Sequence, residues 1–85
     1  MTWRITPAER RALAALDPRI PRHPADLWRR DRVRIATLHR IDSPLGDRPA
    51  LAQRLHLKPA TMYRTPYWDF YVLTRDGQAA LAAPR

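Results

Sequence analysis

Arginine is the residue type in this sequence whose number and chemistry point most directly to a ligand. The chain of 85 residues carries 16 Lys and Arg against 8 Asp and Glu, a formal net charge of +8, and every one of these cations except Lys58 is an arginine. The planar guanidinium binds phosphate and carboxylate groups through paired hydrogen bonds. We therefore expect a polyanionic partner, with nucleic acid as the leading class. An acidic protein surface is the alternative, and an arginine-rich, GC-rich genome would explain the charge without any partner.

Side chains that could perform catalysis or hold a metal ion are few and poorly spaced. Ser43 is the single serine and lies in a turn beside a proline, and the three histidines, His23, His39 and His56, lack the spacing of a zinc site. The sequence has no cysteine, which excludes disulfides and thiolate chemistry. With two glycines it also has no glycine-rich phosphate loop. We expect no enzyme, no cofactor and no metal.

Size and apolar content indicate one folded domain. A chain of 85 residues leaves room for a single domain, and 45% hydrophobic residues is too many for a disordered basic tail. No apolar run approaches the ~18 residues that a membrane span needs, and the amino-terminal residues lack the apolar stretch of a signal peptide. We expect a cytoplasmic protein with no membrane association.

The first helix is predicted by its capping signal. Thr6-Pro7-Ala8-Glu9 has the hydroxyl, proline and glutamate of a capping box, and good helix formers follow. We expect this helix to end before Pro18, because the residue before a proline is disfavoured in a helix.

A second helix is expected to begin at Asp26 or Asp31, either of which can cap it, and to run to about Ile41. Its apolar residues fall on one face, which predicts a stripe directed at the core. Arg34 and Asp31 interrupt this stripe, so the first turn could be a separate segment. Trp28 belongs to the stripe and is expected in the core, as is Trp3.

The second half of the chain mixes helix and strand signals. A third helix is predicted over residues 48–56, capped by Asp47, and a short fourth helix over residues 60–64 between two prolines. Aromatic and β-branched residues predict a strand over residues 70–74, and Thr74 caps a last helix.

Residues 50–64 resemble a helix-turn-helix, because Ala52 is small enough for two helices to cross closely and Pro59 marks the start of a second helix. Residues 73–81 resemble the exit from strand to helix in winged helix-turn-helix repressors. The resemblance covers about residues 31–83. It implies a mainly α single domain with a small β element, with the helix-turn-helix at about 47–65 and the strand and exit helix at about 70–83.

The resemblance also implies a function, which is double-stranded DNA binding by a small transcriptional regulator of prokaryotic or phage type. A short recognition helix would enter the major groove, and a homodimer is expected because one short module covers little DNA. The residues expected to contact bases are Thr61, Tyr63 and Arg64. The residues expected to contact phosphates are Arg48, Arg54, Lys58 and Arg75.

Two alternatives remain open in the sequence. Residues 61–65 and 70–74 could pair as a hairpin, which would remove the recognition helix, and residues 2–6 could supply a strand beside 70–74. The chain could also dock an acidic protein, for example as a phage-encoded inhibitor. Its docking surface would then be aromatic, and core packing is the competing role for these same side chains. The aromatic residues concerned are Tyr67, Trp68 and Tyr71.

Overall fold

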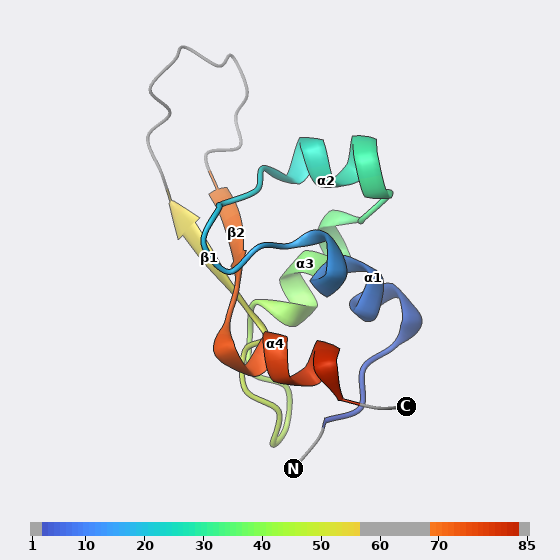
Figure 1. Cartoon of the computed structure of the whole chain (residues 1–85), viewed down its shortest axis with the longest axis vertical. Helices are drawn as coiled ribbons and strands as arrows, with labels where there is room; N and C mark the ends of the chain where they lie inside the picture. Colours follow the sequence, from blue (N-terminus) through green and yellow to red (C-terminus); the bar gives the residue numbers. More distant parts are fainter. Residues whose placement is uncertain (1–2, 57–68, 84–85) are drawn as a thin grey trace.

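Four helices and two strands make up the part of the chain that the computed structural model describes, residues 3–56 and 69–83. In chain order they are α1 (Pro7–Ala15), α2 (Pro24–Asp31), α3 (Ile35–Ile41), β1 (Ala52–His56), β2 (Asp69–Leu73) and α4 (Arg75–Ala82). Figure 1 shows the two strands on one side of the molecule, α1, α2 and α3 on the other, and α4 at the lower end. The described residues form a small mixed α/β domain.

The capping box predicted for α1 is confirmed. Thr6 Oγ1 accepts a hydrogen bond from the Glu9 backbone N–H at 3.1 Å, and Glu9 Oε1 accepts one from the Thr6 N–H at 2.8 Å. Pro7 occupies the first helical position, and the helix ends at Leu16 as its N–H bonds to the carbonyl of Leu13. The side chain of Asp17 then accepts two backbone N–H groups and turns the chain.

Two helices occupy the region predicted to reach Ile41, so one continuous helix is wrong and the alternative of a separate first segment is closer to the structure. The N-cap of α2 is His23, whose Nδ1 accepts the Ala25 N–H at 3.0 Å, and neither of the two predicted aspartates caps it. The chain leaves α2 at Arg32, which has a left-handed backbone (φ 57°, ψ 33°), and enters α3 after Arg34. The break directs Val33 into the core between the two helices, where it is buried.

The helix predicted over residues 48–56 is also wrong, because residues 52–56 form β1. This strand pairs antiparallel with β2, in a register that runs from Ala52 opposite Leu73 to His56 opposite Asp69. The sequence of β1 consists largely of helix formers, but β2 is aromatic and β-branched and its backbone groups need partners. Tertiary pairing therefore decides the conformation of β1 against its local propensity.

The strand predicted over residues 70–74 is confirmed within one residue as β2, with partners other than those predicted. One edge pairs with β1, and at the other edge Tyr71 exchanges two backbone hydrogen bonds of 2.9 Å with Arg22. Residues 3–6 form no strand, and residues 61–65 lie outside the described part of the chain.

The last helix, α4, is confirmed together with its cap. Thr74 Oγ1 accepts the Gly77 N–H at 3.0 Å and donates to the carbonyl of Ala50, also at 3.0 Å. A Cβ atom at Gly77 would collide with the carbonyl oxygen of Leu51, so α4 lies directly against the chain that enters β1.

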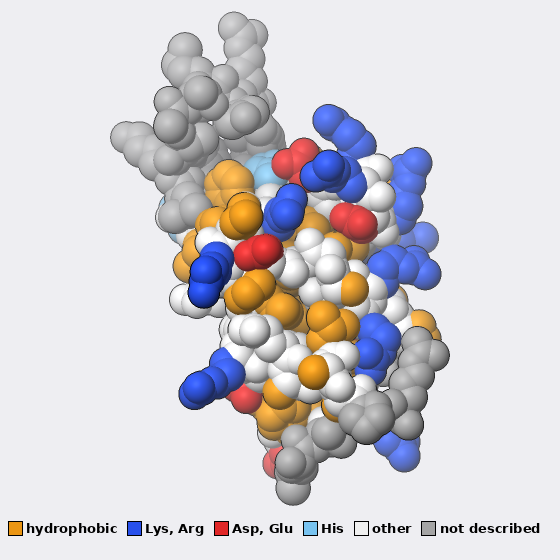
Figure 2. All heavy atoms as spheres, viewed as in Figure 1, with side chains coloured by type: hydrophobic (Ala, Val, Ile, Leu, Met, Phe, Trp, Pro, Cys, Tyr) orange, Lys and Arg blue, Asp and Glu red, His pale blue; other side chains and the backbone are white. Residues whose placement is uncertain are grey.

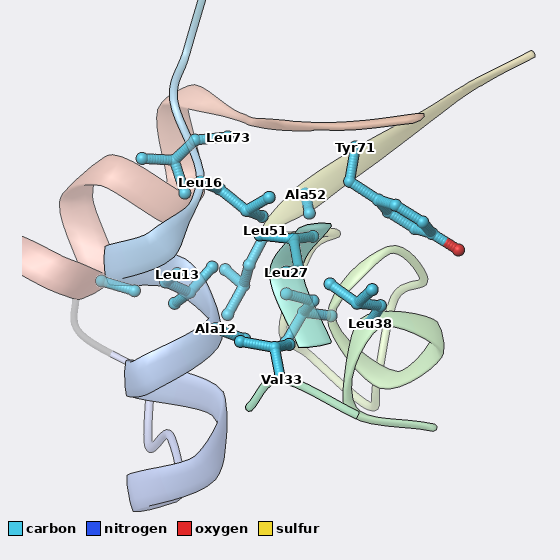
Figure 3. Packing of buried hydrophobic residues seen from close by; sticks show 12 residues of the cluster. Ala12, Leu13, Leu16, Leu27, Val33, Leu38, Leu51, Ala52, Tyr71 and Leu73 are labelled. Carbon is cyan, nitrogen blue, oxygen red and sulfur yellow. The ribbon is translucent and has the colours of Figure 1, made fainter. Parts of the chain in front are cut away.

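The hydrophobic core takes side chains from all six elements and from the segments between them. Figure 3 shows Leu13, Leu27 and Val33 converging from α1, α2 and the turn that follows it. Trp3 is partly buried against this core, but Trp28 is 47% exposed, so its predicted core position is wrong. The remaining buried members include Ala12, Leu16, Leu38, Ile41, Leu51, Ala52, Tyr71, Leu73 and Ala80.

Candidate nucleic-acid interface

Most of the residues predicted to contact DNA or a partner protein lie outside the described residues. These are Lys58, Thr61, Tyr63, Arg64, Tyr67 and Trp68, all within residues 57–68, which join β1 to β2 in the chain. The first helix of the predicted helix-turn-helix is absent, because residues 52–56 are a strand. A candidate interface must therefore be built from the other elements.

Arg48, predicted to contact phosphate, is a core residue. Its guanidinium makes a two-point ion pair with Glu9, from Nη1 to Oε1 at 3.2 Å and from Nη2 to Oε2 at 2.9 Å. It also donates to the backbone carbonyls of Arg4 and Arg40, at 3.3 and 3.4 Å. With 7% of Arg48 exposed, this guanidinium is committed to the fold and does not face a ligand.

The charge of Glu9 is preserved inside the protein. Burial alone would raise the pKa of its carboxyl group. The hydrogen bonds from Arg48 and from the Thr6 N–H, with the charges of Arg48 and Arg40, outweigh that burial and hold the pKa below its ordinary value. Glu9 therefore remains ionised at neutral pH, and its pair with Arg48 fixes the start of α1 against the segment that precedes β1.

Tyr71, predicted as part of an aromatic docking surface, is a core residue as well. It is fully buried at the centre of β2, and this burial raises the pKa of its phenol. Of the predicted phosphate contacts, Arg54 and Arg75 are exposed. Arg54 lies on β1 with its Nε 3.8 Å from Asp42 Oδ2, while Arg75 is the first residue of α4.

The densest group of exposed cations lies on α2, α3 and the turn between them. We call residues 24–41 the α2–α3 unit. Its two acidic residues are Asp26 and Asp31, and both are exposed. Figure 2 shows arginine side chains, in blue, gathered at the upper right of the molecule, over the region where Figure 1 places α2. The arginines of the unit, all exposed, are Arg29, Arg30, Arg32, Arg34 and Arg40.

The turn of the α2–α3 unit is strained and carries one of these cations. Arg32 has the one left-handed backbone among the non-glycine residues that the structure describes. That conformation costs about 1 kcal/mol for a residue with a Cβ atom. Its guanidinium carbon lies 5.1 Å from the ring centroid of Trp28, a cation–π contact. The contact holds the indole and the guanidinium together on the surface.

An open, mostly apolar groove separates α2 from α3. This α2–α3 groove has a volume of about 520 Å³ and is lined by residues 24 and 25, by Trp28 and by residues 33–36. Val33 is buried at its floor, whereas Trp28 and Ile35 are about half exposed, and Arg34 contributes a cation. The groove is therefore an apolar surface with one exposed arginine, Arg34, in its lining and with Arg32 against its Trp28.

The hairpin of β1 and β2 is fixed to the amino-terminal end of α2. Arg22 is bonded to β2 through the backbone of Tyr71, and the ring of His23 meets the ring of Phe70 edge to face, at 5.3 Å between centroids and 72°. Since His23 is also the N-cap of α2, the hairpin and the α2–α3 unit keep a set relative position. Residues 57–68, which lie between β1 and β2 in the sequence, include two more cations, Lys58 and Arg64.

None of the arginines of the α2–α3 unit was predicted as a site residue, although their density in the sequence could have indicated them. Four arginines fall within residues 29–34, the highest local density in the chain. In one continuous helix, Arg29 and Arg32 would lie outside the apolar stripe and Arg34 would interrupt it. The break places Arg32 and Arg34 in the turn, directly after Arg29 and Arg30 at the end of α2, and no glycine marks that break.

Some kinds of site are missing from residues 3–56 and 69–83. No helix there is long and apolar enough to cross a membrane, and no three His, Cys, Asp or Glu side chains gather closely enough to hold a metal ion. Comparisons with protein-family models, with curated proteins and with solved structures find no match for this chain.

Proposed function

We propose that this chain binds double-stranded DNA as a winged helix-turn-helix domain whose motif lies earlier in the sequence than residues 47–65. In this proposal α2 and α3 are the helix-turn-helix, and β1 and β2 are the strands of the wing. The order of the elements supports it, since three helices, two antiparallel strands and a final helix follow one another along the described chain. This order matches the family resemblance with the motif moved forward.

The connection between α2 and α3 supports the proposal geometrically. Residues 32–34 form a short turn with one left-handed residue, and such a turn sets the two helices of a helix-turn-helix at an angle. The inner face of α3 is buried through Leu38 and Ile41. Its outer face exposes residues 35, 36, 39 and 40, and the major groove of DNA admits a helix of this kind.

The observation that carries the proposal is the concentration of exposed arginines on the α2–α3 unit. Five guanidinium groups within 18 residues, against two carboxylates, give the unit a local excess of positive charge. Phosphate contacts supply most of the affinity for DNA and position a protein on the duplex. The unit could therefore contact phosphates on both sides of the groove that α3 enters.

This proposal changes the roles of the residues that were predicted to contact bases and phosphates. Lys58, Thr61, Tyr63 and Arg64 lie in the sequence between the two wing strands, outside the described residues, and the proposal assigns them no contact. Arg54 on β1 and Arg75 on α4 remain candidates for phosphate contacts. A homodimer would place two such units on one site and double the contacts.

A second candidate function has one observation in its favour. The half-exposed Trp28, stacked with Arg32, resembles the aromatic and arginine anchors found at the centres of protein–protein interfaces. An acidic protein with an apolar side chain could occupy the α2–α3 groove. This partner would compete with DNA for the same arginines.

The test is the salt dependence of affinity for a generic duplex of about 20 base pairs. With four to six phosphate contacts, the slope of log affinity against log salt should be roughly −4 to −5. Arg34→Gln should weaken binding and reduce the slope by about 1. The control is Arg11→Gln, which removes an exposed arginine from α1 outside the unit and should change neither quantity. Absence of duplex binding at low salt would contradict the proposal and favour the acidic protein partner.

A further inference from the structure

We propose that the α2–α3 groove receives the 5-methyl groups of thymine, so that this chain discriminates thymine from other bases by apolar contact at the start of α3. The inference rests on the proposed DNA binding and goes beyond it, because phosphate contacts alone do not distinguish one sequence from another.

The groove is apolar where a DNA-binding surface is otherwise polar. Trp28 is 47% exposed and Ile35 is 43% exposed, and both line the groove beside the buried Val33. A partner that covers these large side chains would remove their apolar surface from water. The same partner would meet the arginines of the unit. A partner that covers these apolar side chains and also pairs with the arginines must place an apolar group between anionic groups.

Thymine in duplex DNA has that chemistry. The major-groove edges of the bases carry hydrogen-bond donors and acceptors, which are polar. The 5-methyl of thymine is the apolar group on these edges that a protein contacts with aliphatic side chains. The phosphates of the two DNA strands flank the major groove on either side. The α2–α3 groove offers the complementary pattern, since its lining is mostly apolar, includes the cation of Arg34 and has Arg32 against Trp28.

The position of the apolar side chains in α3 agrees with this partner. Ile35 and Ala36 are the first two residues of α3, and they follow directly after the cation of Arg34. Helical spacing places His39 and Arg40 one turn further along the same exposed face. Because Ile35 and Ala36 adjoin Arg34, a phosphate contact by Arg34 would bring these two side chains close to the neighbouring base edges.

The experiment compares two duplexes that are identical and rich in A·T pairs, except that one contains uracil wherever the other contains thymine. Uracil presents the same hydrogen-bonding groups and lacks the methyl. We expect the thymine duplex to bind more tightly, by about fourfold for each methyl seated, which corresponds to the burial of one methyl-sized group. Affinities are measured at one fixed salt concentration.

A variant separates direct contact from an effect of uracil on the shape of the duplex. Ile35→Ala removes apolar surface from the groove at an exposed position. The ratio of affinities for the thymine and uracil duplexes should then fall toward one, while affinity for the uracil duplex stays the same. The matched control is Ile20→Ala, since Ile20 is 56% exposed and lies outside the groove. This control should keep the full preference. Thermal melts of both variants check that they fold.

The outcomes distinguish this inference from the proposed function. Equal affinity of the wild-type chain for the two duplexes would overturn the thymine contact and leave DNA binding intact. A thymine preference that survives in Ile35→Ala would also overturn it, because the preference would then come from duplex shape. If neither duplex binds at low salt, the proposed function itself fails and the thymine contact fails with it.

Discussion

Arg48 and Glu9 form a two-point ion pair inside the protein, although they lie 39 residues apart in the sequence. The pair joins the first turn of α1 to the segment that leads into β1. Glu9 also completes the capping box with Thr6, so one carboxylate serves both a local helix start and a long-range contact. Removing the Glu9 charge leaves the Arg48 guanidinium buried with backbone carbonyls as its remaining partners. Removing Arg48 leaves Glu9 with the Thr6 N–H and with Arg40 Nε at 3.7 Å.

Loss of this pair should be the most damaging single change of charge in the described structure. Glu9→Gln keeps the size of the side chain and can still accept at the helix cap, but it leaves the Arg48 cation buried. We expect the free energy of unfolding to fall by about 3 kcal/mol, measured by urea denaturation. The control Arg54→Gln breaks a longer pair with Asp42 in which the arginine is half exposed, and it should cost less than Glu9→Gln.

The same pair predicts that stability falls in acid. The native pKa of Glu9 lies below its ordinary value of 4.5, because the hydrogen bonds and charges of its partners outweigh its burial. Glu9 therefore binds a proton more readily in the unfolded chain than in the native one. Its contribution is complete above pH 4.5 and is lost as the pH falls from there through the native pKa.

Urea denaturation at a series of pH values checks this contribution of Glu9. Between about pH 5 and pH 3 the wild-type chain should lose more stability than Glu9→Gln does, since the variant has no carboxyl group to protonate at this position. Parallel pH profiles for the two proteins would show that Glu9 does not carry the effect.

Local signals in the sequence were sufficient where neighbouring residues determine the structure. The capping box at Thr6 and the cap at Thr74 act within three residues, and both were predicted. The β-branched and aromatic residues of β2 likewise located that strand. These features need no information from distant parts of the chain.

Long-range pairing explains the elements that could not be predicted. β1 contains Ala52, Gln53 and Leu55, which favour a helix locally, and it becomes a strand because β2 offers a partner from later in the chain. The break between α2 and α3 lies at Arg32, a residue with no preference for a left-handed backbone. The arginine density of residues 29–34 was visible in the sequence, but the shared surface depended on that break.

Gly77 should be required for the packing of α4. An alanine there would gain up to about 1 kcal/mol in helix propensity, but its Cβ would collide with the Leu51 carbonyl oxygen and approach Leu73 Cδ1 within 2.8 Å. We expect Gly77→Ala to lose about 2 kcal/mol net, measured by urea denaturation, because backbone atoms cannot move aside cheaply.

Gly46→Ala is the matched control for this substitution. Gly46 has φ +60° and open space around it, so the change should cost only about 1 kcal/mol of backbone strain. A Gly77→Ala protein as stable as the wild type would contradict the close approach of α4 to Leu51.

Arg32 allows the strain of the α2–α3 turn to be separated from its charge. Arg32→Gly relieves about 1 kcal/mol of left-handed strain and loses a half-exposed cation–π contact of about 0.5–1 kcal/mol with Trp28, so the net change in stability should be small. The proposed DNA binding predicts weaker affinity and a salt slope smaller by about 1 for this variant. Thermal melting and duplex titrations measure the two effects independently. Unchanged affinity with unchanged stability would remove Arg32 from the interface and show that its cation serves no phosphate contact.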